Sequence, residues 1–205
     1  MTHRAPTTAP DTTECSIRPH DINKVALRRD LLARRRGIAA PLRSQWDALI
    51  GQQVLALCQQ LHVDKLGIYA PIRGEPDLSA TFLQLHQAGI ALCLPMVVQA
   101  HAPLRFARWQ PDTVMSRDQF GINVPATPEW ETLPQFILIP CVGFNAAAYR
   151  LGYGGGFYDR TLAAASAPTI SVGIAYQCLA TEFSPGPHDI ALNQIITESS
   201  HQSSH

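Results

Sequence analysis

The sequence lacks an excess of charge of either sign, a long apolar run and an apolar leader. Its 16 Lys and Arg residues balance 16 Asp and Glu residues in 205 positions. Bulk electrostatics therefore attract neither nucleic acid nor an anionic membrane. No stretch reaches the roughly 18 apolar residues that a membrane span needs, and the first fifteen residues lack the core of a signal peptide. We expect a cytoplasmic protein in which any anion site is local.

Paired cysteines are also absent. The five cysteines are odd in number, scattered, and form no Cys-x-x-Cys motif: Cys15, Cys58, Cys93, Cys141 and Cys178. This pattern argues against a disulfide framework or a zinc site and favours free thiols in a reducing cytosol. Cys141 is interpreted as a small buried residue rather than a nucleophile, because no His or Asp partner is recognisable near it.

The chain has enough apolar residues for one sizeable core, since 46% are hydrophobic and only 16% are charged. Apolar periodicity predicts helices over residues 21–38 and 42–61, and a third that is capped by Asp77 or Ser79 and runs to Gly89. Short apolar segments predict strands at 65–71, 90–96, 104–109, 135–140, 169–176 and 193–197. We expect an α/β fold, a three-layer α/β/α domain over residues 21–198 with a mainly parallel or mixed sheet. Residues 1–20 and 199–205 are predicted to be disordered tails.

The segment "RLGYGGGFYDR", residues 150–160, has four glycines in five positions. It follows an apolar strand and precedes a helix predicted to begin near Phe157, so its backbone N–H groups and the helix dipole both favour a phosphate. A glycine-rich turn without a ligand is the alternative. The spacing fails the dinucleotide motif G-x-G-x-x-G, and the absence of a following Lys-Ser/Thr excludes a P-loop.

Cations for such a phosphate must come from outside this loop. Lys24 and Arg28 are four residues apart and share one face of the first predicted helix. With Arg29, Arg34, Arg35 and Arg36 nearby, a solvated basic face is by itself the better explanation of the pair.

The segment "PCVGFNAAAYRLGYGGGFYDR", residues 140–160, resembles the signature of the 5-formyltetrahydrofolate cyclo-ligase (methenyltetrahydrofolate synthetase) family. Three further segments fit in the same order: "KVALR" at 24–28, "YAPIRGEPD" at 69–77 and "HDIALNQIIT" at 188–197. The resemblance extends from about Asn23 to Thr197. It implies ATP-dependent closure of 5-formyltetrahydrofolate to 5,10-methenyltetrahydrofolate through phosphorylation of the formyl oxygen, with release of ADP and phosphate.

The resemblance also implies roles for individual residues. Arg150, Lys24 and Arg28 would be the catalytic cations, and Asp159 and Asp189 would bind Mg²⁺, although Asp159 also suits the first turn of a helix. The ATP site would comprise Lys24, Val25, Ala26, Leu27, Arg28, Arg150, Leu151, Gly152, Tyr153, Gly154, Gly155, Gly156, Phe157 and Tyr158. The folate site would comprise Glu75 and Ala70, with ring contacts from Trp109, Tyr153 and Phe157.

Within these segments the chain departs from the family pattern at three positions. Asn145 and Asn193 stand where aspartates are usual, and Ala148 stands where a glycine is usual. None of these changes affects the glycines, Asp159 or Glu75.

Two other functions fit the predicted fold. A sugar-phosphate isomerase or a CoA-transferase-like enzyme would also place its site at strand ends, but would release no ADP in the presence of the folate. A non-catalytic reduced-folate-binding protein would need no phosphate or magnesium ligands, so Asp159, Asp189, Lys24 and Arg28 argue against it. We expect a monomer that acts on small molecules (a reduced folate and ATP), with no nucleic-acid or membrane partner.

Overall fold

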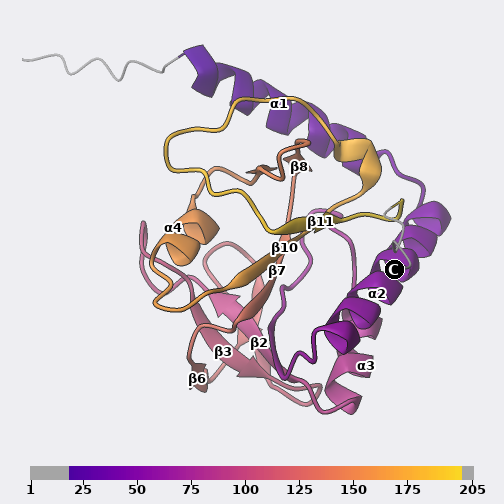
Figure 1. The fold of residues 1–205 in the computed structure, drawn as a ribbon, viewed down its shortest axis with the longest axis vertical. Coiled ribbons are helices and arrows are strands. Elements are labelled where there is room, and N and C mark those ends of the chain that lie inside the picture. Colours follow the sequence, from indigo (N-terminus) through magenta and orange to yellow (C-terminus); the bar gives the residue numbers. More distant parts are fainter. Residues whose placement is uncertain (1–18, 200–205) are drawn as a thin grey trace, which may run out of the picture.

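A computed structural model describes residues 19–199, and Figure 1 shows the helices arranged around a central sheet. The helices are α1 (Pro19–Arg36), α2 (Ala40–Gln60), α3 (Ser79–Gln87) and α4 (Phe157–Ala163), with a 3₁₀ turn η1 at Gln177–Leu179. The tails predicted at 1–20 and 199–205 lie outside the described residues, except for residues 19, 20 and 199. Residues 19 and 20 already belong to α1, so this helix begins two residues earlier than predicted.

The seven-stranded sheet has the order β11-β10-β7-β1-β2-β3-β6. Its strands are β1 (Lys65–Gly67), β2 (Ala91–Met96), β3 (Arg105–Trp109), β6 (Trp130–Glu131), β7 (Phe136–Pro140), β10 (Ile170–Ile174) and β11 (Gln194–Ile196). The five strands from β11 to β2 are parallel, whereas β3 and β6 continue the sheet in antiparallel pairings. The predicted mixed, mainly parallel sheet is confirmed.

Successive side chains of a strand point to opposite faces of the sheet, and each face has its own core. Leu66, Leu92, Leu138 and Val172 pack on the face covered by α2 and α3. The other face carries a smaller core, against which Tyr158 and Leu162 of α4 pack: Cys93, Phe106, Ile137, Ile139, Cys141, Phe144, Ala175 and Leu192. The three layers follow from this alternation (Figure 1).

Two small hairpins were not predicted from the sequence. One pairs β4 (Met115–Arg117) with β5 (Asn123–Pro125), and the other pairs β8 (Gly143–Phe144) with β9 (Arg150–Leu151). The second interrupts what we predicted to be a direct connection from β7 to the glycine segment. It turns at Ala148, whose φ is 58°, and the backbone N–H groups of Ala147 and Tyr149 donate to the side-chain oxygen of Asn145.

Two local predictions need correction at β1 and α3. The strand predicted at 65–71 ends at Gly67, because the chain then leaves the sheet for the turn that carries Glu75. The N-cap of α3 is Leu78, which makes no capping hydrogen bond through its side chain. Asp77 lies one residue earlier, and its carboxylate accepts the Ser79 N–H at 3.0 Å.

The predictions of free thiols and of no membrane span can be compared with the structure over the described residues. Cys58, Cys93, Cys141 and Cys178 are free thiols, and Cys15 lies outside the described residues. None of the helices between residues 19 and 199 is long and apolar enough to cross a bilayer.

Gly173 of β10 tests how tightly the smaller core is packed. A Cβ added there would lie 2.8 Å from Leu192 Cδ1, 3.2 Å from Cys141 Sγ, and closer still to Ile195. We expect Gly173→Ala to lower the free energy of unfolding by about 1–3 kcal/mol through overpacking. Gly37→Ala, whose Cβ would make only ordinary contacts, should change it by less than about 0.5 kcal/mol. Urea titrations in which the two variants lose equal stability would contradict this packing.

Candidate active site

The glycine segment forms a loop between β9 and α4 at the carboxyl end of the parallel strands. Gly154 and Gly156 have φ angles of 98° and 63°, a left-handed conformation that favours glycine. Gly156 is also the N-cap of α4. Gly152 has an ordinary φ, and nothing lies within 4 Å of the position that a Cβ would take there. Glycine is therefore required by the backbone at two positions, while at Gly152 the space beside the backbone is open.

Two arginines flank this loop. Arg28 of α1 donates from Nε to the Gly152 carbonyl at 2.7 Å, and its guanidinium carbon lies 3.7 Å from a Cβ position on Gly154. Arg160 of α4 donates to the Gly155 carbonyl and lies over the Phe157 ring, 5.2 Å from its centroid. Arg160 closes the glycine motif in the sequence, yet sequence reasoning gave it no role. The loop thus has a cation on either side.

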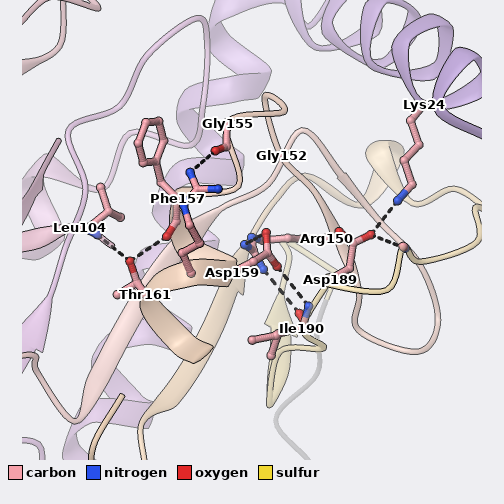
Figure 2. Close-up of polar contacts among 12 residues, drawn as sticks. Lys24, Leu104, Arg150, Gly152, Gly155, Phe157, Asp159, Thr161, Asp189 and Ile190 are labelled. Carbon is pink, nitrogen blue, oxygen red and sulfur yellow. Dashed lines mark hydrogen bonds and ion pairs between the residues drawn. The ribbon is translucent and has the colours of Figure 1, made fainter. Parts of the chain in front are cut away.

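Two ion pairs lie side by side next to the loop (Figure 2). Lys24 Nζ is 2.6 Å from Asp189 Oδ2, and Arg150 Nη2 is 2.8 Å from Asp159 Oδ2. The pairs are linked through the backbone, because the Ile190 N–H donates to Asp159 Oδ1 at 3.1 Å. Together they bring four residues predicted for the site into one cluster, with the two positive charges offset by two carboxylates.

Asp189 forms a half-buried ion pair with Lys24. Burial raises the pKa of Asp189, but the hydrogen bonds from Lys24 and from the Gly186 N–H outweigh it and hold this pKa below its ordinary value. The carboxylate is consequently ionised at neutral pH and presents negative charge beside Lys24.

Glu75 lies in the turn after β1 and is only 3% exposed. Its Oε2 accepts the Ile72 N–H at 2.9 Å, and its Oε1 accepts the Tyr153 hydroxyl at 2.8 Å. Burial raises the pKa of Glu75, and the hydrogen bonds from Ile72 and Tyr153 with the charges of Arg35 and Arg73 offset this only in part. Tyr153 belongs to the glycine loop, so this hydrogen bond joins the predicted phosphate and folate sites.

Arg35 is the functional residue that sequence reasoning missed most clearly. It is 0% exposed, and its guanidinium donates to the Tyr153 hydroxyl at 2.6 Å and to two backbone carbonyls. The sequence did hold a signal, because Lys24, Arg28, Leu31 and Arg35 follow at spacings of four, three and four, which places them on one face of α1. The buried Leu31 on that face indicates that the face packs inward.

The remaining residues predicted for the site differ in their placement. Phe157 packs edge-on against Phe120, with centroids 6.2 Å apart, and Tyr158 lies under Arg150. Leu151 is buried and offers only its backbone. Ala70 is half-buried between the end of β1 and the turn that carries Glu75.

Within the segment 24–28, the intervening residues do not face the cluster equally. Val25 is 63% exposed, Ala26 is half-buried, and Leu27 packs against the larger core. Lys24 and Arg28 supply the side-chain contacts of this segment with the site.

Trp109 is not brought together with the other predicted folate residues. It pairs with Leu92 at the start of β2, and Leu92 pairs with Leu66 of β1. Because β3 is antiparallel, its last residue lies at the opposite end of the sheet from Glu75. Trp109 packs there against the larger core.

Of the three departures from the family pattern, the one at Asn145 has a local explanation. Asn145 Nδ2 donates to the Phe183 carbonyl at 3.2 Å, which an aspartate could not do. The Asn193 side-chain oxygen accepts the backbone N–H and the hydroxyl of Ser171. Ala148 occupies a left-handed conformation, which explains why glycine suits this position.

Two cavities open away from the glycine loop, although Ile190, whose N–H donates to Asp159, also lines the first of them. One of about 450 Å³ is lined by residues including Leu162, Thr169 and Ser171, and one of about 390 Å³ by residues including Lys65 and Gln135. Both are at the starts of parallel strands, whereas the glycine loop and Glu75 lie beyond the ends of such strands. Ligands of open α/β sheets gather at the carboxyl ends of the strands, so the cluster is the better candidate site.

An α/β fold that gathers a glycine loop, several cations, one buried carboxylate and two half-buried ones at the carboxyl ends of its strands is typical of an enzyme for an anionic small molecule. The chain belongs to the 5-formyltetrahydrofolate cyclo-ligase family, whose model matches residues 21–198. The resemblance stated from the sequence is confirmed, and the chain is an enzyme of this family of ligases.

Individual relatives match over most of the chain. It is 33% identical to the 5-formyltetrahydrofolate cyclo-ligase of Haemophilus influenzae, over 83% of this chain and 95% of the relative. The solved 5,10-methenyltetrahydrofolate synthetase of Mycoplasma pneumoniae is similar with a TM-score of 0.72 at 28% identity, over 86% and 99% of the two chains. The corresponding synthetase of Aquifex aeolicus gives a TM-score of 0.76 at 28% identity, over 86% and 90%.

The raised pKa of Glu75 predicts a pH dependence of stability. A raised pKa means that Glu75 binds its proton more tightly in the folded state than in the unfolded chain. The contribution of this proton to the free energy of unfolding is complete below the ordinary pKa of 4.5 and is lost as pH rises through the pKa of the folded state. We expect the free energy of unfolding of Glu75→Gln, relative to the wild type, to increase from pH 4.5 to pH 7. Urea titrations at several pH values measure it, with Glu182→Gln at an exposed carboxylate as the control for losing one charge. A difference that falls with pH would contradict the assignment.

Proposed function

We propose that this chain catalyses the ATP-dependent closure of 5-formyltetrahydrofolate to 5,10-methenyltetrahydrofolate, with release of ADP and phosphate. Family membership supports the folate and the cyclisation. The observation that carries the proposal for this chain is the hydrogen bond from Tyr153 of the glycine loop to Glu75. It puts a loop suited to phosphate beside a buried carboxylate suited to the N–H donors of a pterin.

The chemistry accounts for the need for ATP. The oxygen of a formamide is a poor leaving group, so the γ-phosphoryl group is transferred to the formyl oxygen and ADP leaves. N10 then attacks the formyl carbon, the C–O bond breaks, and phosphate departs, while N10 loses its proton. The enzyme has to align the two substrates and offset the developing negative charge, and little covalent chemistry remains for its side chains.

The phosphate site is assigned to the backbone of residues 152–156 and the cations around it. Arg28 and Arg160 already donate to carbonyls of this loop. Lys24 and Arg150 are held by carboxylates, and a polyphosphate can replace these carboxylates as their partner. Because α4 has only seven residues, its dipole is a minor term beside these four cations.

Asp159 and Asp189 suit Mg²⁺ in the chemistry of their oxygen donors, since this ion commonly takes one or two carboxylates together with substrate phosphates. Both carboxylates are ion-paired, and between residues 19 and 199 no group of three or more metal-binding side chains of the His, Cys, Asp and Glu types occurs. We infer that the ion binds with the nucleotide rather than before it. When bound, Mg²⁺ would neutralise charge on the phosphate oxygens.

The folate is assigned to Glu75 and Ala70, with Tyr153 and Phe157 as ring contacts. Glu75 keeps acceptor capacity beyond its two internal hydrogen bonds, since a carboxylate can accept about four. Trp109 is left out of this proposal because it lies at the other end of the sheet.

The proposal is tested by incubating the protein with 5-formyltetrahydrofolate and following the absorbance of the methenyl product and the release of ADP. Product should form only when ATP and Mg²⁺ are both present, with one ADP released for each folate closed. ADP release without product, or folate binding without turnover at any ATP concentration, would overturn it. The second result would favour a folate-binding protein.

Gly152 offers a probe of the phosphate loop that leaves the fold unchanged. Alanine at this position meets no neighbouring atom and no left-handed φ, so the melting temperature of the free protein should hold. A methyl group in the open space should obstruct phosphate and lower turnover by about 100-fold or more, by analogy with the loss of one donor to a transition-state oxyanion.

The measurement combines cyclisation kinetics with thermal unfolding in the presence and absence of Mg-ATP, where the stabilisation by the nucleotide should shrink. Gly155→Ala is a poorer probe, because its Cβ would lie 2.8 Å from the Phe157 ring. Full turnover of Gly152→Ala together with an undiminished nucleotide effect would remove the phosphates from this loop.

A further inference from the structure

Arg35 makes contacts that its place in a basic helix does not explain. Its guanidinium is fully buried and donates to oxygens of three separate segments. Nε donates to the Arg73 carbonyl at 3.2 Å, Nη1 to the Cys141 carbonyl at 3.3 Å, and Nη2 to the Tyr153 hydroxyl at 2.6 Å. A buried charge is costly unless it is fully paired, so this residue is held by the turn after β1, the end of β7 and the glycine loop together.

The hydroxyl of Tyr153 is thereby given one orientation. An arginine has donors only, so the oxygen of Tyr153 accepts from Arg35 and its proton is left for another acceptor. That acceptor is Glu75 Oε1 at 2.8 Å. The guanidiniums of Arg35 and Arg73 also lie 5.9 and 5.2 Å from the centroid of the Tyr153 ring. The chain Arg35–Tyr153–Glu75 therefore runs in one direction, from a fixed cation to a buried carboxylate.

We propose that Arg35 is a positioning residue for folate recognition, because it directs the Tyr153 hydroxyl to Glu75 and so fixes the carboxylate that receives the N–H donors of the reduced pterin. The inference rests on the proposed function and adds to it a residue outside the predicted site. Arg35 touches neither substrate in this scheme and acts only through Tyr153 and Glu75.

The groups that face Glu75 support an effect on its ionisation. Arg35 and Arg73 are the cations, and Tyr153, Tyr69, Tyr158 and Cys141 are the neutral titratable groups around it. Burial raises the pKa of all four neutral groups, that of Cys141 to about 12, so they stay protonated. The charge on Glu75 consequently depends on the donors Ile72 and Tyr153 and on the two arginines.

The test compares Arg35→Met, Arg35→Lys and Tyr153→Phe by steady-state kinetics across pH, varying folate and ATP separately. Loss of the directed hydrogen bond should raise the KM for folate roughly 10- to 100-fold, as expected for a hydrogen bond to a charged group, and leave the KM for ATP within a few-fold. The acid limb of kcat/KM for folate should move to higher pH, because the donor that lowers the pKa of Glu75 is gone. Arg35→Lys keeps a donor, so its KM for folate and its acid limb should lie between those of the wild type and those of Arg35→Met.

Two further variants complete the design. Arg29→Met, at a neighbouring arginine of α1 whose side chain is 77% exposed, should retain the wild-type KM and pH profile. Glu75→Gln should lose the acid limb. If Arg35→Met does not fold, Tyr153→Phe tests the proposal by itself, because it removes only the hydroxyl that links Arg35 to Glu75.

The outcomes separate the two proposals. A wild-type protein that does not close the folate would overturn the proposed function. A wild-type protein that does, alongside a Tyr153→Phe variant with an unchanged folate KM and an unmoved acid limb, would overturn only the role of Arg35.

Discussion

The buried guanidinium of Arg35 is the contact on which the geometry of the site depends. It fixes the end of α1 to the turn after β1, to the end of β7 and to the glycine loop. Leu31, one turn earlier on the same helix face, is buried in the larger core. Because the C-terminal half of α1 is held in this way, its N-terminal half places Arg28 against the Gly152 carbonyl and Lys24 against Asp189. One helix face therefore serves both ends of the site, the Glu75 end through Arg35 and the phosphate end through Arg28 and Lys24.

The phosphate end holds four cations and two carboxylates, a local excess of positive charge in a chain that has no net charge. Lys24 with Asp189 and Arg150 with Asp159 form two adjacent ion pairs that are only partly exposed. Such pairs keep two of the four cations ordered in the absence of a ligand and offset part of the positive charge. A polyphosphate that brings its own divalent cation can exchange partners with both pairs at once, so that each cation meets phosphate and each carboxylate meets metal. The arrangement favours a metal–nucleotide complex over a simple anion.

Much of this architecture could be predicted from the sequence, because apolar strands, a glycine loop and the helix at Phe157 leave strong local patterns. What could not be predicted depends on contacts between distant segments. The hairpin of β8 and β9 depends on the side chain of Asn145 and a left-handed Ala148, neither of which has a strand-like pattern. Trp109 was assigned to the folate site as an aromatic ring that could pack on the folate, and only the antiparallel direction of β3 shows that it lies at the other end of the sheet. Arg35 stands among solvated arginines in sequence, and its burial follows from the packing of α1.

The most direct test of this account is a structure of the protein with a non-hydrolysable ATP analogue, Mg²⁺ and 5-formyltetrahydrofolate. The account predicts phosphate oxygens at hydrogen-bonding distance, about 2.7–3.2 Å, from backbone N–H groups of residues 152–156, with Lys24 turned from Asp189 to phosphate. It also predicts the pterin against Glu75, with the hydrogen bond from Tyr153 retained. A nucleotide bound instead in the cavity beside Leu162, Thr169 and Ser171, at the amino ends of the parallel strands, would contradict the account.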